Sequence, residues 1–332
     1  MSIRILSPGL LTTVQDLGRH GHQRDGIPVA GAMDGFALRL ANILVGNADE
    51  SAGLEITLAG PTLSFGAEAL IALTGAEFDA MVDGERAPAW RPLWVPAGAT
   101  LSLSRAVRGC RAYLAVAGGI DVPLVLGSRS TYLRASLGGK GGRPLHRDDV
   151  LDHLVPGPLS RRMAARLAAG RSDFAAASWG AGFSFARLYS AAPTVRLLPG
   201  EQLSLLSERG RAELWRAEFR VGVQSDRMGY RLEGPVLELS EWRELLSEAV
   251  TFGTVQRPPG GSPIVLMADR QTTGGYPRIG EVATIDHSLL AQLKPGDHLR
   301  FRPISLEEAQ RLYLAREAEL AQARAAIALN HR

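Results

Sequence analysis

The sequence is poor in lysine and cysteine. Only Lys140 and Lys294 among its 37 basic residues are lysine, so Schiff-base or other lysine chemistry has at most two candidates. The single cysteine, Cys110, excludes an intramolecular disulfide and a cysteine-rich zinc site. The remaining 35 basic residues are arginine, whose guanidinium stays charged and binds carboxylate or phosphate through two parallel hydrogen bonds.

Long apolar runs and an excess of one charge are also lacking. No stretch reaches the roughly 18 apolar residues that a membrane helix needs, and residues 1–15 lack the apolar core and cleavage-like end of a signal peptide. The formal net charge is only +3, without the basic face or block that binds nucleic acid or a membrane surface. We therefore expect a cytoplasmic protein that binds neither.

Generic catalytic motifs fail as well. The run Gly138–Gly142 resembles a phosphate-binding loop, but a glycine follows Lys140 and Arg134 occupies the position of the leading glycine. His20 and His22 lack the carboxylate or cysteine spacing of a metal site. Neither a nucleotide loop of the Walker type nor a metal site is predicted.

What the sequence does contain is typical of a β-rich globular protein. With 332 residues, of which 45% are hydrophobic, the chain excludes general disorder and has the length of about two domains. Its 37 glycines and 19 prolines separate short, often alternating segments, and Asp83-Gly84 suits a two-residue hairpin turn. The predicted strands are 54–58, 70–74, 78–82, 100–104, 112–117, 195–198, 218–223, 264–267 and 298–302.

One local pattern occurs three times. Residues 96–103, 199–205 and 295–301 each begin with a Pro/Gly turn and continue as a predicted strand that alternates apolar and polar residues. The recurrence in both halves indicates two related β-domains, although such units are common enough to arise by chance.

Few helices are predicted. Asp34 can cap a helix that Gly46 ends, Ser240 can cap a helix over 241–250, and residues 161–169 can form a short helix. A capping box at 305–308 starts a helix to about residue 328, and we expect its apolar stripe to pack on its own barrel. The stripe consists of Leu306, Ala309, Tyr313, Leu320, Ala323 and Ile327.

Three polar clusters lie among glycines, where a backbone can approach a ligand closely. The first spans 12–19 and continues to Asp34, the second spans 224–231, and the third, 268–277, follows the apolar strand 264–267 directly. Each is also compatible with simple turn chemistry or a surface ion pair. The third cluster points most strongly to function, because loops at strand ends commonly hold functional groups.

Four strings in these regions resemble a known family. They are TTVQDLGRHGHQRDGIPVAGAMD, YLAVAGGIDVPLVLGSRSTY, QSDRMGYRLEGP and VLMADRQTTGGYPRIGEVATID. Together they are similar to the C subunit of bacterial 5-oxoprolinase, a group also called KipA-like, allophanate hydrolase subunit 2 or the biotin-dependent carboxyltransferase family. The resemblance runs from about Ile3 to Pro303.

The resemblance implies a mainly β fold of two cyclophilin-like β-barrel domains with a few short helices and a C-terminal helix. We place the N-terminal carboxyltransferase-type domain at 1–188, including a Gly/Ala-rich linker, the second barrel at 189–304 and the C-terminal helix at 305–330.

The resemblance also implies three functions. In the first, the chain acts with two partners, the A and the KipI-like B subunits, to hydrolyse the small cyclic amide 5-oxo-L-proline to L-glutamate, with ATP and Mg²⁺ used at the level of the complex; alone it is expected to be inactive. In the second, it is a biotin-dependent carboxyltransferase for a urea-like amide, with biotin on another protein. In the third, it is a non-enzymatic antagonist of a sensor-kinase inhibitor.

The two enzymatic reactions, 5-oxoproline hydrolysis and carboxyl transfer, both create negative charge on an amide-like oxygen. Fixed hydrogen-bond donors stabilise such a charge. Three arginines are candidate anion clamps, and a neighbouring carboxylate in each cluster is a candidate proton acceptor, water-orienting group or Mg²⁺ ligand. These predicted catalytic residues are Asp16, Arg19, Asp226, Arg227, Asp269 and Arg270. The predicted substrate-binding residues are Thr13, Gln15, Asp34, Gln224, Tyr230, Gln271, Thr272, Thr273 and Tyr276.

Overall fold

The computed structural model describes residues 2–181, 189–241 and 245–331. The chain splits into two compact units: unit 1 contains Met1–Arg19, Asp34–Leu188 and Ala318–Arg332, and unit 2 contains His20–Met33 and Tyr189–Glu317. Residues 20–33 lie within the predicted N-terminal domain but belong to unit 2. Residues 318–332 cover the second half of the predicted C-terminal helix and belong to unit 1. The predicted junction at 188/189 borders residues 182–188, which lie outside the described part of the chain.

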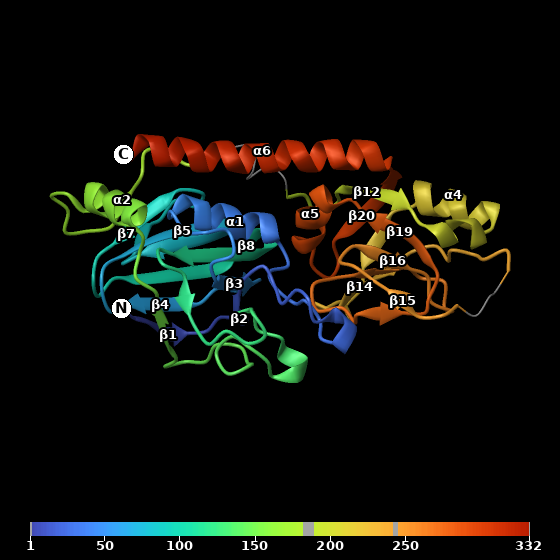
Figure 1. Ribbon diagram of the computed structural model, residues 1–332, viewed down its shortest axis with the longest axis horizontal. Helices are drawn as coiled ribbons and strands as arrows, with labels where there is room; N and C mark the ends of the chain where they lie inside the picture. The colour runs from blue at the N-terminus through green and yellow to red at the C-terminus, as the bar shows by residue number, and fades with distance from the viewer. Residues whose placement is uncertain (1, 182–188, 242–244, 332) are drawn as a thin grey trace. The chain divides into compact units, whose positions relative to one another are not determined.

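Most elements of unit 1 are strands (Figure 1). They are β1 (Ser2–Ser7), β2 (Leu11–Gln15), β3 (Gly53–Thr57), β4 (Thr62–Phe65), β5 (Ala69–Val82), β6 (Glu85–Arg86), β7 (Pro92–Val95), β8 (Thr100–Val116), β9 (Ile120–Asp121), β10 (Val150–His153) and β11 (Ala175–Ala176). The helices of this unit are α1 (Gly35–Leu44), the short η2 (Leu133–Ala135) and α2 (Pro158–Ala168).

Two long strands organise unit 1. β5 and β8 pair along most of their lengths, and the other strands join them in a branched 11-stranded sheet. The register shifts just after Gly75, whose φ of +82° suits glycine and where a Cβ would lie 2.4 Å from the Arg111 carbonyl oxygen. The shift lets one continuous strand pair take part in two regions of the sheet.

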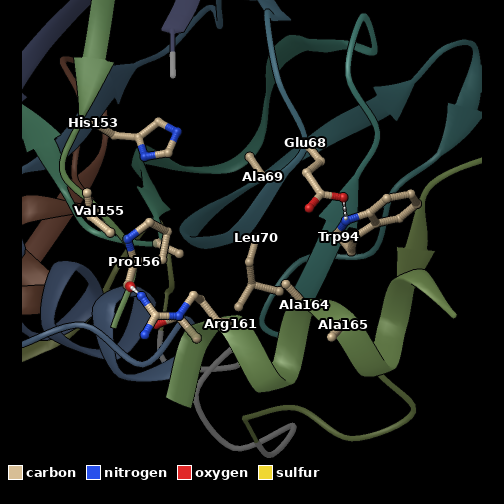
Figure 2. Close-up of a pocket in the computed structure, with 12 residues that line it drawn as sticks. Glu68, Ala69, Leu70, Trp94, His153, Val155, Pro156, Arg161, Ala164 and Ala165 are labelled. Carbon is tan, nitrogen blue, oxygen red and sulfur yellow. Dashed lines mark hydrogen bonds between the residues drawn. The ribbon is translucent and has the colours of Figure 1, made fainter. Parts of the chain in front are cut away.

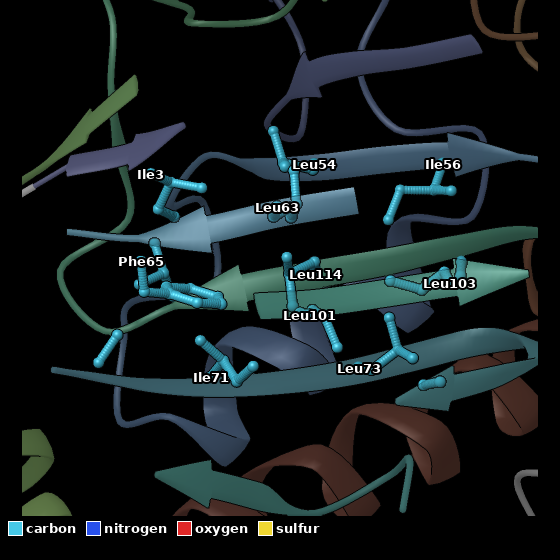
Figure 3. Packing of buried hydrophobic residues seen from close by; sticks show 14 of the residues in the cluster. Ile3, Leu54, Ile56, Leu63, Phe65, Ile71, Leu73, Leu101, Leu103 and Leu114 are labelled. Atoms are coloured by element: carbon cyan, nitrogen blue, oxygen red, sulfur yellow. The ribbon is translucent and has the colours of Figure 1, made fainter. Parts of the chain in front are cut away.

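Both faces of this sheet carry apolar side chains. On one face, residues such as Leu54, Phe65, Ile71 and Leu101 form a core to which β1, β3, β4, β5 and β8 contribute (Figure 3). On the other face, Leu70 and neighbouring residues pack with α1, α2 and the end of the C-terminal helix. Burial on both sides explains why 69–73 and 112–117 are continuous apolar runs rather than alternating ones.

Unit 2 is built on a closed barrel of seven strands, in the order β12-β19-β16-β17-β14-β13-β20. Its strands are β12 (Thr194–Pro199), β13 (Phe219–Val221), β14 (Gly229–Glu233), β16 (Thr254–Gln256), β17 (Ile264–Leu266), β19 (Arg278–Val282) and β20 (His298–Pro303), with a separate pair β15 (Glu248–Ala249) and β18 (Thr273–Gly274). Its helical elements are η1 (Gln23–Asp25), η3 (Glu201–Leu205), α4 (Glu208–Arg216), η4 (Thr284–Asp286) and α5 (His287–Ala291).

The barrel interior is filled by aliphatic and aromatic side chains. Phe219 and Phe301 lie with ring centroids 5.8 Å apart, and Met33, from the segment 20–33, belongs to the same core. The mainly β fold class is thus confirmed, and unit 2 provides a closed barrel.

The C-terminal helix α6 (Leu306–Asn330) begins at the predicted capping box, where the Glu308 amide donates to Ser305 Oγ. Only the C-terminal part of the predicted apolar stripe is buried: Leu320 and Ile327 lie in the core of unit 1, whereas Leu306 and Tyr313 are exposed. Two arginines of α2, Arg162 and Arg166, donate to the carbonyls of His331 and Asn330. These donors satisfy carbonyls that a helix end leaves without intrahelical partners.

Two sequence predictions are wrong. The expected helix over 241–250 is absent from 245–250, where the chain forms β15 and pairs with β18, while 242–244 lie outside the described residues. The expected strand after Pro199 is instead the 3-10 helix η3. Its polar residues lie on the surface, so the turn is not followed by a buried alternating face.

Among the described helices, none combines the length and the apolar character that crossing a bilayer requires.

Candidate functional site

The first polar cluster forms an internal clamp within unit 1. Asp16 Oδ1 accepts hydrogen bonds from the hydroxyls of Ser128 and Ser130 and from the Gly18 amide, at 2.7, 2.5 and 2.8 Å. Arg19 is fully buried and donates to the carbonyls of Val125, at 3.1 Å, and Ser130, at 2.8 Å. These bonds use Asp16 and Arg19 to hold the 125–130 loop, and a catalytic role for either stays a prediction.

The predicted binding residues near this clamp are also buried. Gln15 Nε2 donates to Thr13 Oγ1 and to the Thr131 carbonyl, at 3.0 and 3.1 Å. Asp34 is the N-cap of α1, where its side chain accepts from the Ala37 amide at 3.0 Å. The structure therefore gives Asp34 a helix-capping function, which the sequence also indicated.

The second cluster lies in unit 2, in the connection between β13 and β14. Asp226 is exposed and accepts from the Met228 amide, which makes it a turn-forming residue. Tyr230 is buried in the barrel core, and its hydroxyl donates to the Leu293 carbonyl at 3.0 Å. Gln224 is exposed. The structure does not gather these three side chains around one point.

Arg227, from the same connection, has a different environment. Its guanidinium donates through Nε and Nη2 to the two carboxylate oxygens of Asp269, each at 3.0 Å, and Nη2 also donates to the Gly31 carbonyl at 2.5 Å. Arg227 and Asp269 are 7% and 4% exposed. This buried bidentate pair joins three segments of unit 2 and holds the start of the third cluster, 268–277, in place.

Beyond Asp269, the 270–274 segment lies against the outside of the barrel. In the register of β16 and β19, Val255 pairs with Gly280 and Thr254 pairs with Glu281. Because Val255 is in the barrel core, the neighbouring Thr254 and Glu281 point away from it. The pair β15–β18 covers this surface: a Cβ on Gly274 would meet Gln256 Nε2 at 2.4 Å.

We name the polar residues gathered here the outer-face cluster. It consists of Thr251, Thr254, Gln256, Arg270 and Glu281, all in unit 2.

Glu281 is the central acid of the outer-face cluster. Its carboxylate accepts hydrogen bonds from the hydroxyls of Thr254, at 2.8 Å, and Thr251. Burial raises the pKa of Glu281 from its ordinary value of 4.5 to about 7, against the lowering effects of the Thr254 hydroxyl and of Arg278 and Arg270. A carboxyl group with this pKa exchanges its proton near neutral pH, as a general acid or base requires.

Arg270 supplies the positive charge of the cluster. It interacts electrostatically with Glu281 and Asp269, and within the described residues its hydrogen bonds are long ones to the carbonyls of Val250 and Met267, at 3.4 and 3.3 Å. Burial lowers the pKa of Arg270, but a guanidinium remains charged in proteins. Held by weak bonds, this cation is suited to bind an anion.

Gln256 supplies a neutral donor. It is 1% exposed, and its Nε2 has no hydrogen-bond partner among the described residues. A buried amide group without a partner costs free energy, so an acceptor from a bound molecule would relieve it. Arg270 and Glu281 interact electrostatically and can together bind an anion and move a proton, and Gln256 is a candidate donor from the neighbouring strand β16.

Of the predicted residues, Arg270 belongs to the outer-face cluster. Its neighbours Gln271, Thr272 and Thr273 lie in the segment that covers the cluster. Tyr276, at the end of that segment, is 45% exposed. The sequence reasoning missed Glu281, Thr254 and Gln256. A polar alternation around Val255 was the available signal, but 254–256 is only three residues long.

The comparisons with known proteins now define the family. Residues 25–303 match the model of the carboxyltransferase domain, subdomains A and B, and the chain belongs to this family. Among curated relatives, it is 39% identical to the 5-oxoprolinase C subunit of Haemophilus influenzae, over 97% of each chain. It is 42% identical to the 5-oxoprolinase C subunit of Escherichia coli, over 92% of this chain and 93% of the relative.

A solved structure shares the same fold. The crystal structure of Kluyveromyces lactis urea carboxylase superposes with a TM-score of 0.86 and 30% identity, over 97% of this chain. This chain spans 29% of that protein, which is therefore much longer.

Breaking the Arg227–Asp269 pair should destabilise unit 2. Asp269→Ala leaves a buried guanidinium without its counter-ion, and we expect a loss of about 3 kcal/mol in the free energy of unfolding. Asp79→Ala, in the exposed Arg86–Asp79 pair, is the control and should cost at most about 1 kcal/mol. Urea unfolding followed by fluorescence measures both, and equal small losses would contradict the structural importance of the buried pair.

The raised pKa of Glu281 predicts a pH-dependent gain in stability for Glu281→Gln. The folded state binds the Glu281 proton more tightly than the unfolded state, so the contribution of this group to stability is fully present below pH 4.5 and is lost as pH rises toward 7. The uncharged glutamine avoids this loss, and its advantage should grow by about 1–2 kcal/mol between pH 5 and pH 8. Urea unfolding at both pH values tests this, with the exposed Glu85→Gln as control; an advantage that does not change with pH would refute it.

Proposed function

We propose that this chain is the C subunit of an ATP-dependent 5-oxoprolinase, which acts with the A and B subunits to hydrolyse 5-oxo-L-proline to L-glutamate. The observation that carries the proposal is full-length similarity: two curated C subunits match at 39% and 42% identity over at least 92% of both chains.

The outer-face cluster supports this chemistry. 5-Oxoproline carries a carboxylate and a lactam carbonyl, and attack by its oxygen on ATP or by water on its ring moves negative charge onto oxygen. Arg270 would bind the carboxylate or the developing oxyanion, and Gln256 Nε2 would donate to the carbonyl oxygen. Glu281 would accept or return the proton, since its pKa of about 7 keeps both protonation states populated.

ATP and Mg²⁺ fit less well on this chain alone. Within the described ranges, no group of three His, Cys, Asp or Glu side chains is arranged to hold a metal ion. Lys140, the lysine of the glycine-rich run, donates to the Val150 carbonyl at 2.9 Å. We therefore assign no step through the nucleotide to these residues and expect it to be bound in the assembled complex.

Activity of the assembled complex tests the proposal. We expect glutamate release from 5-oxoproline and ATP when the chain is co-expressed with its cognate A and B subunits, and none from the chain alone. Arg270→Ala should lower kcat/KM by about 100-fold, because removal of an oxyanion donor typically has an effect of this size. Arg211→Ala, on the exposed surface of α4, should leave the rate unchanged.

Two results would contradict this account. Turnover by the isolated chain would exclude dependence on the A and B subunits. A complex in which Arg270→Ala assembles and retains wild-type kcat/KM would exclude the outer-face cluster as the anion-binding site.

A biotin-dependent carboxyltransferase is the second candidate, favoured by the TM-score of 0.86 to Kluyveromyces lactis urea carboxylase. In that case Arg270 and Gln256 would bind the oxygen of urea or of the biotin ureido ring, with carboxybiotin delivered by another protein. Transfer of labelled CO2 from carboxybiotin to urea by this chain, without glutamate release by the assembled complex, would favour this function.

A further inference from the structure

A cavity in unit 1 shares no residue with the outer-face cluster. It has a volume of about 270 Å³ and is formed by the start of β5, by β7, by the end of β10 and by α2 (Figure 2). At about 30 Å³ per water molecule, this volume corresponds to roughly nine waters, the size of a ligand with about ten non-hydrogen atoms.

The lining of the cavity is mainly apolar. Ala69 and Leu70 of β5 lie in its middle in Figure 2, and Ala164 and Ala165 approach from α2. An apolar lining favours a ligand with a hydrocarbon body.

Two opposite charges border this apolar middle. Glu68 lies on one side, where its Oε2 accepts from the Trp94 indole N–H at 3.2 Å (Figure 2). Arg161 lies toward the other side, where its Nη1 donates to the Pro156 carbonyl at 2.9 Å. Both side chains are exposed, and each of these bonds is to a neutral group.

Neither charge is neutralised by the protein. In the described part of the chain, Glu68 has no ion-pair partner and Arg161 has none, and the two are not paired with each other. His153 also lines the cavity on the side of Arg161; its Nδ1–H donates to the Leu154 carbonyl at 3.1 Å, so Nε2 of the neutral ring is an acceptor. The cavity thus has a carboxylate acceptor, Glu68, at one side and a guanidinium donor, Arg161, at the other.

We propose that this cavity binds a small zwitterion whose ammonium and carboxylate groups are separated by an apolar segment. The ammonium group would bind Glu68, the carboxylate would bind Arg161, and the hydrocarbon segment would cover Leu70 and Ala164. Such a ligand neutralises both charges at once and buries the apolar surface between them.

The probe is 6-aminohexanoate, which has nine non-hydrogen atoms and charges at its two ends. Its isomer norleucine carries both charges on one carbon, hexanoate lacks the ammonium group and hexylamine lacks the carboxylate. Titration calorimetry on the full chain should show saturable binding of 6-aminohexanoate, with each of the other three compounds at least about fivefold weaker, as the loss of one charge contact implies.

Two variants locate the binding. Glu68→Gln and Arg161→Gln should each weaken 6-aminohexanoate binding by about fivefold or more, and the double variant should abolish it. Glu85→Gln and Arg171→Gln, which remove exposed charges outside the cavity, should have no effect. Circular dichroism and thermal unfolding confirm that each variant is folded.

Three outcomes would overturn the proposal. These are no binding of 6-aminohexanoate, equal binding of hexanoate or norleucine, or binding that is insensitive to both Glu68→Gln and Arg161→Gln. None of them bears on the proposed 5-oxoprolinase activity, because the cavity and the outer-face cluster have no residue in common.

Discussion

The candidate site depends on one buried ion pair. Arg227 donates two hydrogen bonds to the Asp269 carboxylate in a nearly solvent-free environment, and it also donates to the Gly31 carbonyl. A buried pair of this kind contributes little net stability but fixes geometry, because each charge is costly without the other. Through it, the β13–β14 connection and the segment 20–33 are joined to the residue that precedes Arg270.

The barrel then supplies the rest of the site. Alternation along β16 places Val255 inside and Thr254 and Gln256 outside, and pairing with β19 places Glu281 beside Thr254. Burial raises the pKa of the Glu281 carboxyl group to about 7. The position of Glu281 in the barrel, rather than its neighbours in the sequence, thus accounts for this shift.

Local sequence signals predicted much of the fold. The Asp34 cap, the glycine at 46, the Asp83-Gly84 turn and the capping box at 305–308 act within a few residues, so they could be read directly. The helix expected at 241–250 failed because Glu248–Ala249 pairs with Thr273–Gly274, a later segment of the chain, and this pairing overrides local propensity.

The site was predictable only in part, for a related reason. Arg270 was found because a glycine-rich polar loop follows an apolar strand. Glu281 and Gln256 were not, because their burial and their proximity to Arg270 arise from strand register and from the cover, neither of which is local. The polar cluster that contains Asp16 and Arg19 could be located from the sequence. The hydrogen bonds of these two side chains hold the 125–130 loop of the same unit.

The central claim is that the outer face of the barrel holds a carboxyl group poised for proton transfer. The most direct test is a carbon-13 NMR titration of the Glu281 side-chain carboxyl in the isolated chain, assigned by comparison with Glu281→Gln. We predict a midpoint at about pH 7. A midpoint near 4.5, the ordinary value for glutamate, would show a solvated carboxylate and contradict the assignment.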